Sequence, residues 1–600
     1  GRASNATTPN PPKRAAPSES PSRAETTNGS AEAKRAAAGV GERRKRRYLI
    51  AVRPLPGFAP MSADIIHDTL KGMDDVEILR RIRPKGLKGL GAGAHPGAQE
   101  IFVARMDETR AQNLRQSAPP HVVIEPDGVL AAGEPILPAP LAAGRATPTP
   151  RARREVRLQV VGEGDKPLAS AGVTIFGRGL FGFQGITDQS GTANVTIFDA
   201  EAELEDVPAV YVQPTADHWE RLIARPKLHA AEPNLVKLEP LRPKGAEKRV
   251  GWGSQLMGLD GRAAELTGSG VKIGLIDSGC DTSHASLRHV THGVDLTGNG
   301  GREWTRDEIG QGTHCAGIIA GTDGSGVRGI APGAEIHVFK LSPGGHFSDL
   351  IEALDQCIER QIDIVHLGLV TDQYSELVAQ KILEARLKGV ACVAAAGDEG
   401  GPVRYPARLP GVLSVAAIGR LAEFPQETRH ALTAIPELIG PTGLFATNFS
   451  GAGPEIDVCG PGVAVVSSAP GGGLAARDGT AIAAAHVVGF AAVILAHHPL
   501  FRGAYAQRGE QRVKALFDLV RGSAMPPVFD PTRVGAGLPD LQRVPGLGAA
   551  ADRDAWNRAA PHPGAFATAK DGQATVPAGV LSGGLAGAMA LMQLRAVGLL

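Results

Sequence analysis

The chain has 600 residues, a formal net charge of +1 and 42% hydrophobic residues. Its size allows several domains with packed cores, while 63 basic against 62 acidic side chains give no argument for nucleic acid or an anionic membrane as a partner. The five cysteines are odd in number and lack CxxC spacing, so a disulfide framework, a zinc site or another cofactor is not expected.

Residues 1–47 are rich in Ala, Pro, Ser and Thr and end in the basic run 43–47. Such a segment cannot bury enough apolar surface to become ordered, so a disordered basic arm is expected. The basic run is interpreted first as a solvated linker, with a processing site or a tether for polyanions as alternatives.

Residues 48–126 contain four strand-like apolar runs, at 48–53, 76–82, 101–105 and 122–125. Two segments with helical spacing separate them, and Asp107 is placed to cap the second. The resulting order β-α-β-β-α-β is the split ferredoxin-like pattern. Residues 127–154 are rich in Pro, Ala and Gly and are expected to form a linker.

Residues 155–245 change to short alternating strands with tight turns, which indicates a small all-β sandwich. The stretch from Lys166-Pro167-Leu168 through Val173-Thr174-Ile175 to Thr187-Asp188 resembles transthyretin-like modules. The resemblance implies a spacer or docking module.

Residues 250–545 alternate apolar strands with helical segments, which predicts an α/β domain with a parallel sheet flanked by helices. Residues 546–600 form a C-terminal tail. Its last part, 578–600, is long and apolar enough to span a membrane, but Gln593 and Arg595 interrupt it. A docked or amphipathic helix is therefore favoured over membrane association.

Three motifs of the α/β domain lie at strand ends or helix starts, where open parallel sheets place their active sites. The strand 271–276 ends in Asp277, the run Gly310-Gln311-Gly312-Thr313-His314 opens a helix, and Gly479-Thr480-Ala481 opens another. Together they resemble the Asp, His and Ser motifs of subtilisin-like serine peptidases, with Ala481 where the serine belongs.

The resemblance implies a role for each of these positions. Asp277 would orient His314, His314 would act as general base, and a serine at position 481 would attack the peptide carbonyl. Asp398 stands where the family has an asparagine that donates to the oxyanion, which an ionised carboxylate cannot do. Two rescues stay open: a protonated Asp398 that donates, or the backbone N–H of residue 481 acting alone.

The resemblance also implies a cleft in which a substrate strand pairs with two edges of the fold. The residues expected to line it are Leu341, Ser342, Gly344, Leu367, Gly368, Leu369, Ala395, Gly397, Glu399, Arg404, Gly479 and Thr480. Arg404 would favour an acidic side chain, fill the first specificity pocket, or turn to solvent.

A ferredoxin-like unit ahead of such a domain resembles the family's inhibitory propeptide. Residues 48–136 are therefore expected to inhibit the domain in cis, with the tail 128–136 in the cleft. The first interpretation is a self-processing serine endopeptidase zymogen for protein or peptide substrates, inactive because an engineered Ala481 replaces the serine. The alternative is a natural pseudopeptidase that binds strands without cleavage. A propeptide and a β module slightly favour export, while unpaired cysteines favour the cytoplasm.

Overall fold

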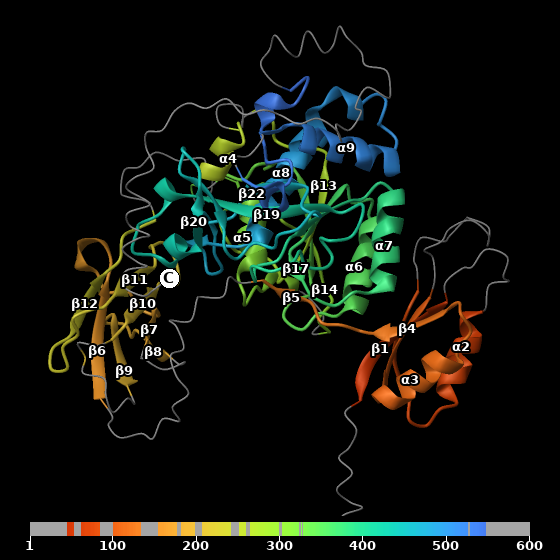
Figure 1. The fold of residues 1–600 in the computed structure, drawn as a ribbon, viewed down its shortest axis with the longest axis horizontal. Helices are drawn as coiled ribbons and strands as arrows, with labels where there is room; N and C mark the ends of the chain where they lie inside the picture. The colour runs from red at the N-terminus through yellow and green to blue at the C-terminus, as the bar shows by residue number, and fades with distance from the viewer. Residues whose placement is uncertain are drawn as a thin grey trace, which may run out of the picture.

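The computed structural model describes residues 45–52, 62–83, 100–133, 154–176, 182–197, 204, 207–241, 251–259, 265–298, 303–322, 326, 328–525 and 529–547. These residues form an N-terminal α+β unit, a β-sandwich and a large α/β unit (Figure 1). Residues 1–44 of the expected arm, 134–153 of the expected linker and 548–600 of the expected tail lie outside the described residues.

The N-terminal unit has the element order that its sequence predicts. It contains β1 (Arg46–Val52), α2 (Ala63–Lys71), β2 (Glu77–Ile82), β3 (Ile101–Met106), α3 (Glu108–Ser117) and β4 (Val122–Pro126). The sheet has the order β2-β3-β1-β4, and its core centres on Tyr48, Ile50 and Phe102. Asp107 caps α3 by accepting from the Arg110 backbone N–H at 2.8 Å. Because β1 begins at Arg46, the expectation of disorder up to residue 47 is wrong at its last two positions.

The β-sandwich consists of two sheets around an aliphatic core. One sheet has the order β11-β10-β7-β8 and the other β12-β6-β9. The strands are β6 (Arg154–Val161), β7 (Gly172–Phe176), β8 (Gly182–Ile186), β9 (Thr192–Ile197), β10 (Ala209–Gln213), β11 (Arg221–Ala224) and β12 (Asn234–Lys237). Alternate residues such as Val156, Leu158 and Val160 are fully buried between the sheets, as the period of two along the sequence predicts.

The large unit is built on a mixed sheet with the order β14-β15-β13-β16-β18-β19-β21-β20, and β22 also pairs with β19. The central pairings are parallel, while β21 and β20 are antiparallel additions at one edge. Its strands are β13 (Lys272–Asp277), β14 (His292–Asp295), β15 (Glu335–Lys340), β16 (Ile364–Leu367), β18 (Ala391–Ala395), β19 (Leu413–Arg420), β20 (Ala434–Ile439), β21 (Leu444–Thr447) and β22 (Val458–Pro461).

Helices cover this sheet, as the strand–helix alternation predicts. They are α4 (Trp252–Leu256), α5 (Gln311–Ala320), α6 (Phe347–Glu359), α7 (Glu376–Leu387), α8 (Thr480–His497), α9 (Glu510–Gly522) and α10 (Pro531–Val534). Within the described residues, α8 alone is long and apolar enough to cross a membrane, but 89% of that window is buried. It packs against α5 and the sheet, as a core helix does.

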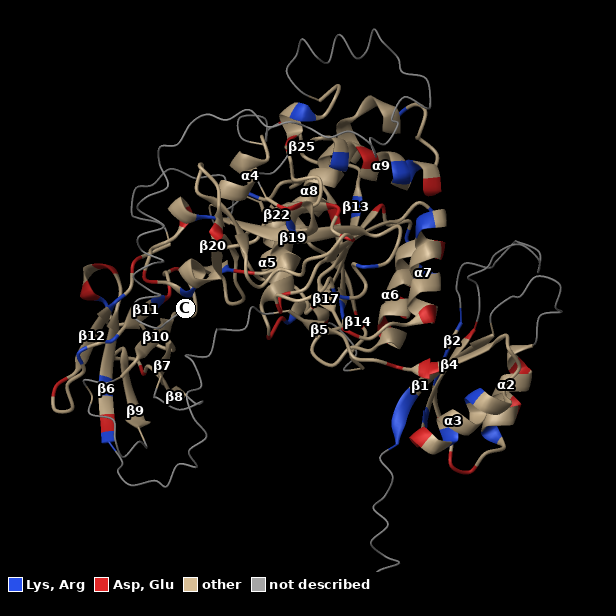
Figure 2. Cartoon of the chain, in the orientation of Figure 1, with Lys and Arg blue, Asp and Glu red and all other residues tan. Residues whose placement is uncertain are grey.

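Six short strands, in three antiparallel pairs, complete the unit, and one of these pairs lies in the cleft. They are β5 (Ala131–Ala132), β17 (Leu369–Val370), β23 (Val465–Ser468), β24 (Leu474–Arg477), β25 (Ala524–Met525) and β26 (Leu538–Pro539). Residues 127–133 open the expected linker, and from residue 128 they are also the expected tail in the cleft. They lie on the large unit, where β5 pairs with β17 (Figure 1). Figure 2 shows acidic and basic residues interspersed over all three units.

Candidate active site

Asp277 ends β13 and is completely buried. Its carboxylate accepts from the Ser278 backbone N–H at 2.8 Å and from Gln311 Nε2, which lies 3.0 Å from Oδ1 and 3.1 Å from Oδ2. Gln311 Nε2 also donates to the Gly368 carbonyl oxygen at 2.9 Å. Burial, partly offset by these donors, raises the pKa of Asp277 to about 7. The side chain that donates to the Asp277 carboxylate is thus the neutral amide of Gln311.

His314 does not lie against Asp277, so the expectation that Asp277 orients it is wrong. Three residues beyond Gln311 in α5, it is carried roughly 4.5 Å further along the helix axis. Its Nε2 lies 2.9 Å from the Val465 carbonyl oxygen and 3.2 Å from that of Ala475. Burial lowers the pKa of His314 to about 3. As a neutral donor, His314 fastens α5 to the hairpin formed by β23 and β24.

Asp307 fixes the start of α5 and therefore the place of Gln311. One of its oxygens accepts from the Gly310 N–H at 2.7 Å and from Ser278 Oγ at 2.8 Å. The other accepts from the Thr313 N–H at 2.8 Å and the Thr313 hydroxyl at 2.7 Å. A carboxylate that satisfies the first N–H groups of a helix stabilises that helix end. The first turn of α5 is consequently held against the carboxyl end of β13.

Ala481 is the second residue of α8 and is buried. Its carbonyl oxygen accepts from His366 Nε2 at 2.9 Å and lies 3.7 Å from Cys315 Sγ. These contacts bring the start of α8 next to Asp277, because His366 Nδ1 is 3.7 Å from Asp277 Oδ2. A methyl group at this position offers no nucleophile for attack on a carbonyl.

Asp398 lies at the start of the same helix and is 3% exposed. Its Oδ1 accepts from the Thr480 N–H at 2.7 Å. A negative charge at a helix N-terminus is favourable, so this contact stabilises α8. At the position where the resemblance implies a hydrogen-bond donor, Asp398 uses this oxygen as an acceptor.

The segment 127–133, which we call the tail, runs through the cleft as an added strand. Ala131 and Ala132 pair antiparallel with Val370 and Leu369 on one side. On the other side, the Leu130 N–H donates to the Gly345 carbonyl oxygen at 2.9 Å, and Phe347 N donates to Gly128 O at 2.9 Å. The Leu130 side chain is 1% exposed and joins the core of the large unit, whereas Val129 is 52% exposed.

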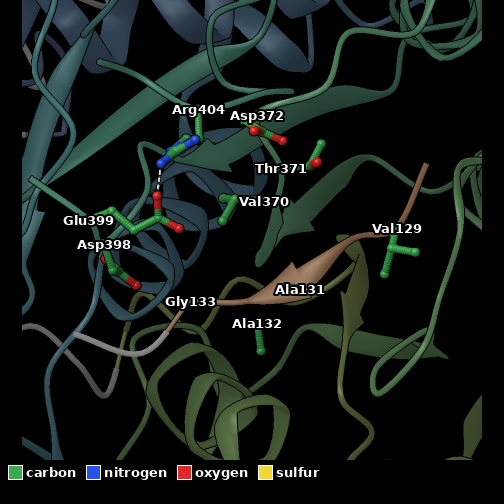
Figure 3. A pocket seen from close by; sticks show the side chains of 10 residues that line it. All are labelled: Val129, Ala131, Ala132, Gly133, Val370, Thr371, Asp372, Asp398, Glu399 and Arg404. Atoms are coloured by element: carbon green, nitrogen blue, oxygen red, sulfur yellow. Dashed lines mark ion pairs between the residues drawn. The ribbon is translucent and has the colours of Figure 1, made fainter. Parts of the chain in front are cut away.

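A cavity of about 370 Å³ opens beside the end of this tail (Figure 3). Its lining includes Gly133, Asp398 and the ion pair between Arg404 and Glu399. The Arg404 side chain is 25% exposed and lies on the cavity wall, so the alternative of a solvent-facing Arg404 is wrong. A Cβ atom on Gly133 would collide with Asp398 Oδ2, which explains why the tail passes this point with a glycine.

The other residues expected in the cleft mostly build its frame. Leu341 and Ser342 donate their N–H groups to the Asp277 carbonyl oxygen, and Leu367 pairs with Ile276 inside the sheet. The Gly397 N–H donates to Thr480 Oγ1 at 3.0 Å, Ala395 ends β18, and Gly479 precedes α8. No described contact joins Gly344 to the tail. The pairing residues are Gly345, the last residue of the expected edge 341–345, and His346, which the sequence did not single out.

Two acidic side chains attach the N-terminal unit to the large unit. Glu125 accepts from Ser375 Oγ at 2.5 Å and from the N–H groups of Glu376 (2.8 Å) and Leu377 (3.3 Å), at the start of α7. Asp127 accepts from the Ser348 N–H and hydroxyl at 2.9 Å each, at the start of α6. Each carboxylate thus caps a helix of the other unit, which aligns the tail between them.

His430 links the β-sandwich to the loop that opens α8. It is completely buried, with Nδ1 2.7 Å from Asp478 Oδ1 and Nε2 3.9 Å from Glu220 Oε1, which belongs to the sandwich. Burial alone would lower the pKa of His430, but the charges of Asp478 and Glu220 outweigh it and, against opposition from Arg429, raise it. His430 therefore holds a proton more readily between the two buried carboxylates, and Arg429 also pairs with Glu220.

Sequence reasoning missed Gln311 and His366 as members of the site. The available signal for Gln311 was its position: only the first turn of α5 can reach the carboxyl end of β13, and Gln311 is the first residue of that helix. His366 lies inside a buried strand, where a lone histidine gives no signal of its own.

Comparison with known proteins places this geometry in a family. Residues 268–516 match the Subtilase family model. The chain is 33% identical over 247 residues to Subtilisin E of Bacillus subtilis (strain 168), which is 40% of this chain and 58% of that protein. It is 32% identical over 247 residues to Subtilisin of Bacillus pumilus, covering 81% of that protein, and 30% identical over 311 residues to M-protease of Shouchella clausii (strain KSM-K16), covering 70%.

Among solved structures, S41 Psychrophilic Protease and Sphericase each match 49% of this chain and 100% of their own, at 25% identity and a TM-score of 0.41. The matched segment spans 58% of the length of Subtilisin E. The relatives support a subtilisin-like domain with an α/β fold, at low identity. This chain belongs to the subtilase family.

Proposed function

We propose that this chain is a pseudopeptidase, a subtilase that binds an extended peptide strand in its cleft without hydrolysing it. The observation that carries the proposal is the pair of hydrogen bonds from Gln311 to Asp277. A general base must accept a proton near neutral pH, and an amide nitrogen that donates to both Asp277 and Gly368 has no such capacity.

Two further positions support the same function. Ala481 has no nucleophilic atom, and Asp398 accepts from the N-terminus of α8 where a donor to an oxyanion would be needed. Nucleophile, base and oxyanion donor are separate requirements of acyl transfer. Three departures from the catalytic pattern in one site favour a domain without peptidase activity over a peptidase in which only the serine is replaced.

The tail supports the binding half of the proposal. It is held by main-chain hydrogen bonds to two edges, with one buried anchor at Leu130. Main-chain pairing gives affinity for any extended strand, and pockets for alternate side chains give selectivity. In this chain the first strand to occupy the cleft is its own.

The second candidate is a serine endopeptidase zymogen with a replaced serine, which the family match favours. A Ser→Ala replacement accounts for Ala481 but leaves Gln311 and Asp398 without explanation. The two candidates therefore differ in what restoring the serine alone should do.

The test restores the site stepwise in the full-length chain. The first variant is Ala481→Ser, the second adds Gln311→His, and the third adds Asp398→Asn to both changes. The readouts are labelling by a fluorophosphonate and self-cleavage measured by intact mass. In subtilisin, which is a relative of this chain, loss of the catalytic histidine alone lowers kcat roughly a million-fold, and we take that magnitude from there. Ala481→Ser alone is therefore expected to stay unlabelled and full length, and label is expected only once Gln311→His is added.

The control is Asp277→Ala in the fully restored variant, which should abolish the label while the cleft stays intact. Rapid labelling or self-cleavage of Ala481→Ser alone would overturn the pseudopeptidase proposal in favour of the zymogen.

A further inference from the structure

A buried triplet of metal-ligand residues lies beneath the cleft. Asp277 ends β13, Cys315 lies in α5 and His366 lies in β16, and all three are fully buried. One ligand atom from each lies within 4.8 Å of the others, and no other group of this kind occurs in the described part of the chain. We propose that these three side chains bind one Zn²⁺ ion.

His366 is arranged as a metal ligand. Its Nε2–H donates to the Ala481 carbonyl oxygen at 2.9 Å, so Nδ1 carries the free lone pair. Nδ1 is buried without a hydrogen-bond partner and lies 3.7 Å from Asp277 Oδ2. Metal-bound histidines typically donate their second ring N–H to a carbonyl or carboxylate, as His366 does here. A cation between Nδ1 and Oδ2 would satisfy a polar atom that is otherwise unsatisfied.

The distances are close to those of a tetrahedral zinc site. Bonds of about 2.0–2.3 Å place ligand atoms of such a site roughly 3.3–3.8 Å apart. The 3.7 Å between His366 Nδ1 and Asp277 Oδ2 lies in this range. Cys315 Sγ, within 4.8 Å of both, has to move inward by a small side-chain rotation. Three protein ligands leave the fourth position for a water molecule.

Charge also favours a divalent ion of borderline softness. A thiolate, a carboxylate and an imidazole suit Zn²⁺ and do not suit Mg²⁺ or Ca²⁺, which prefer oxygen ligands. One Zn²⁺ balances the charges of Cys315 and Asp277, so the assembled site is neutral and its burial is tolerable. The neutral amide of Gln311 cannot supply that counter-charge.

Local sequence patterns do not indicate this site, because its ligands are far apart along the chain and come from three different elements. The site shares Asp277 with the contact to Gln311, but it uses neither the tail nor the pocket. Zinc content and peptide binding can therefore be tested separately. Because the triplet is fully buried, the metal has to enter during folding.

The test measures zinc in full-length protein produced with and without added Zn²⁺, after gel filtration in chelator-free buffer. One zinc per chain by mass spectrometry of the metal is expected, together with a thiolate-to-cobalt charge-transfer band when Co²⁺ replaces Zn²⁺ during refolding. Cys315→Val and His366→Asn should lose both signals. Cys459→Val, which changes another fully buried thiol outside the triplet, should keep them.

The melting temperature gives a second readout that does not depend on the metal analysis. Zinc present during refolding should raise the melting temperature of the unchanged protein and of Cys459→Val, and leave that of Cys315→Val unchanged. Folded protein prepared with zinc that holds no stoichiometric metal would overturn the proposal. Zinc that persists in Cys315→Val would also overturn it, by showing that the ion is held elsewhere.

Discussion

Shortening Leu130 should release the tail from the cleft. The side chain is 1% exposed and packs into the core of the large unit, so Leu130→Ala removes three buried carbon atoms from a well-packed site. Buried Leu→Ala changes destabilise by about 2–5 kcal/mol, which corresponds to roughly 30-fold to several thousand-fold in the equilibrium between docked and undocked tail. Val129→Ala is the matched control. The Val129 side chain, next to Leu130 in the chain, is 52% exposed, so shortening it should change that equilibrium little.

Two measurements follow the tail. Hydrogen exchange should accelerate at the Leu130 and Phe347 amides, whose bonds join the tail to its edge, in Leu130→Ala and not in Val129→Ala. A fluorescent peptide with the sequence of residues 127–134 should then bind Leu130→Ala in trans, while the unchanged chain excludes it. Equal exchange in both variants, or peptide binding that ignores the tail, would refute the assignment of Leu130 as the anchor.

Two further predictions concern the contacts between units. Glu125→Ala removes a carboxylate that caps α7, so docking of the N-terminal unit onto the large unit should weaken by about 1–2 kcal/mol. Limited proteolysis of the N-terminal unit should then become faster. The control Glu77→Ala breaks only an exposed ion pair and should have little effect. The raised pKa of His430 means that its protonation stabilises the fold below about pH 6.5 and that this contribution is lost as the pH rises through the higher folded-state pKa. In denaturant titrations from pH 6 to pH 9, His430→Asn should therefore flatten the decline in unfolding free energy; an unchanged slope would contradict the assignment.

Local patterns were sufficient to predict the elements that carry the site. Alternating or continuous apolar runs predict the strands, because their period follows from the backbone itself, and the carboxyl end of β13 marks Asp277. The two cleft edges were also predicted, and the structure pairs the tail with Leu369 on one of them.

The assignment of the histidine failed because a motif does not say which helical position faces the sheet. Gln311 and His314 share one motif, but only Gln311 lies in the turn next to Asp277. The long-range contacts were beyond local patterns altogether. Glu125 and Ser375 are 250 residues apart, and nothing in either segment names the other as its partner.

The contact between the β-sandwich and the hairpin of β23 and β24 changes what counts as a minimal folding unit. Asp217 of the sandwich exchanges hydrogen bonds with Leu474 of β24, and Leu241 packs on the same leucine. The hairpin in turn accepts a hydrogen bond from His314 and leads into Asp478, which pairs with His430. An expression fragment that begins at residue 250, where the sequence pattern places a boundary, would expose the apolar contact at Leu474. It would also remove Glu220 from Arg429 and His430. A fragment that starts before Arg154 keeps the contact between the β-sandwich and the hairpin, and is the one to crystallise.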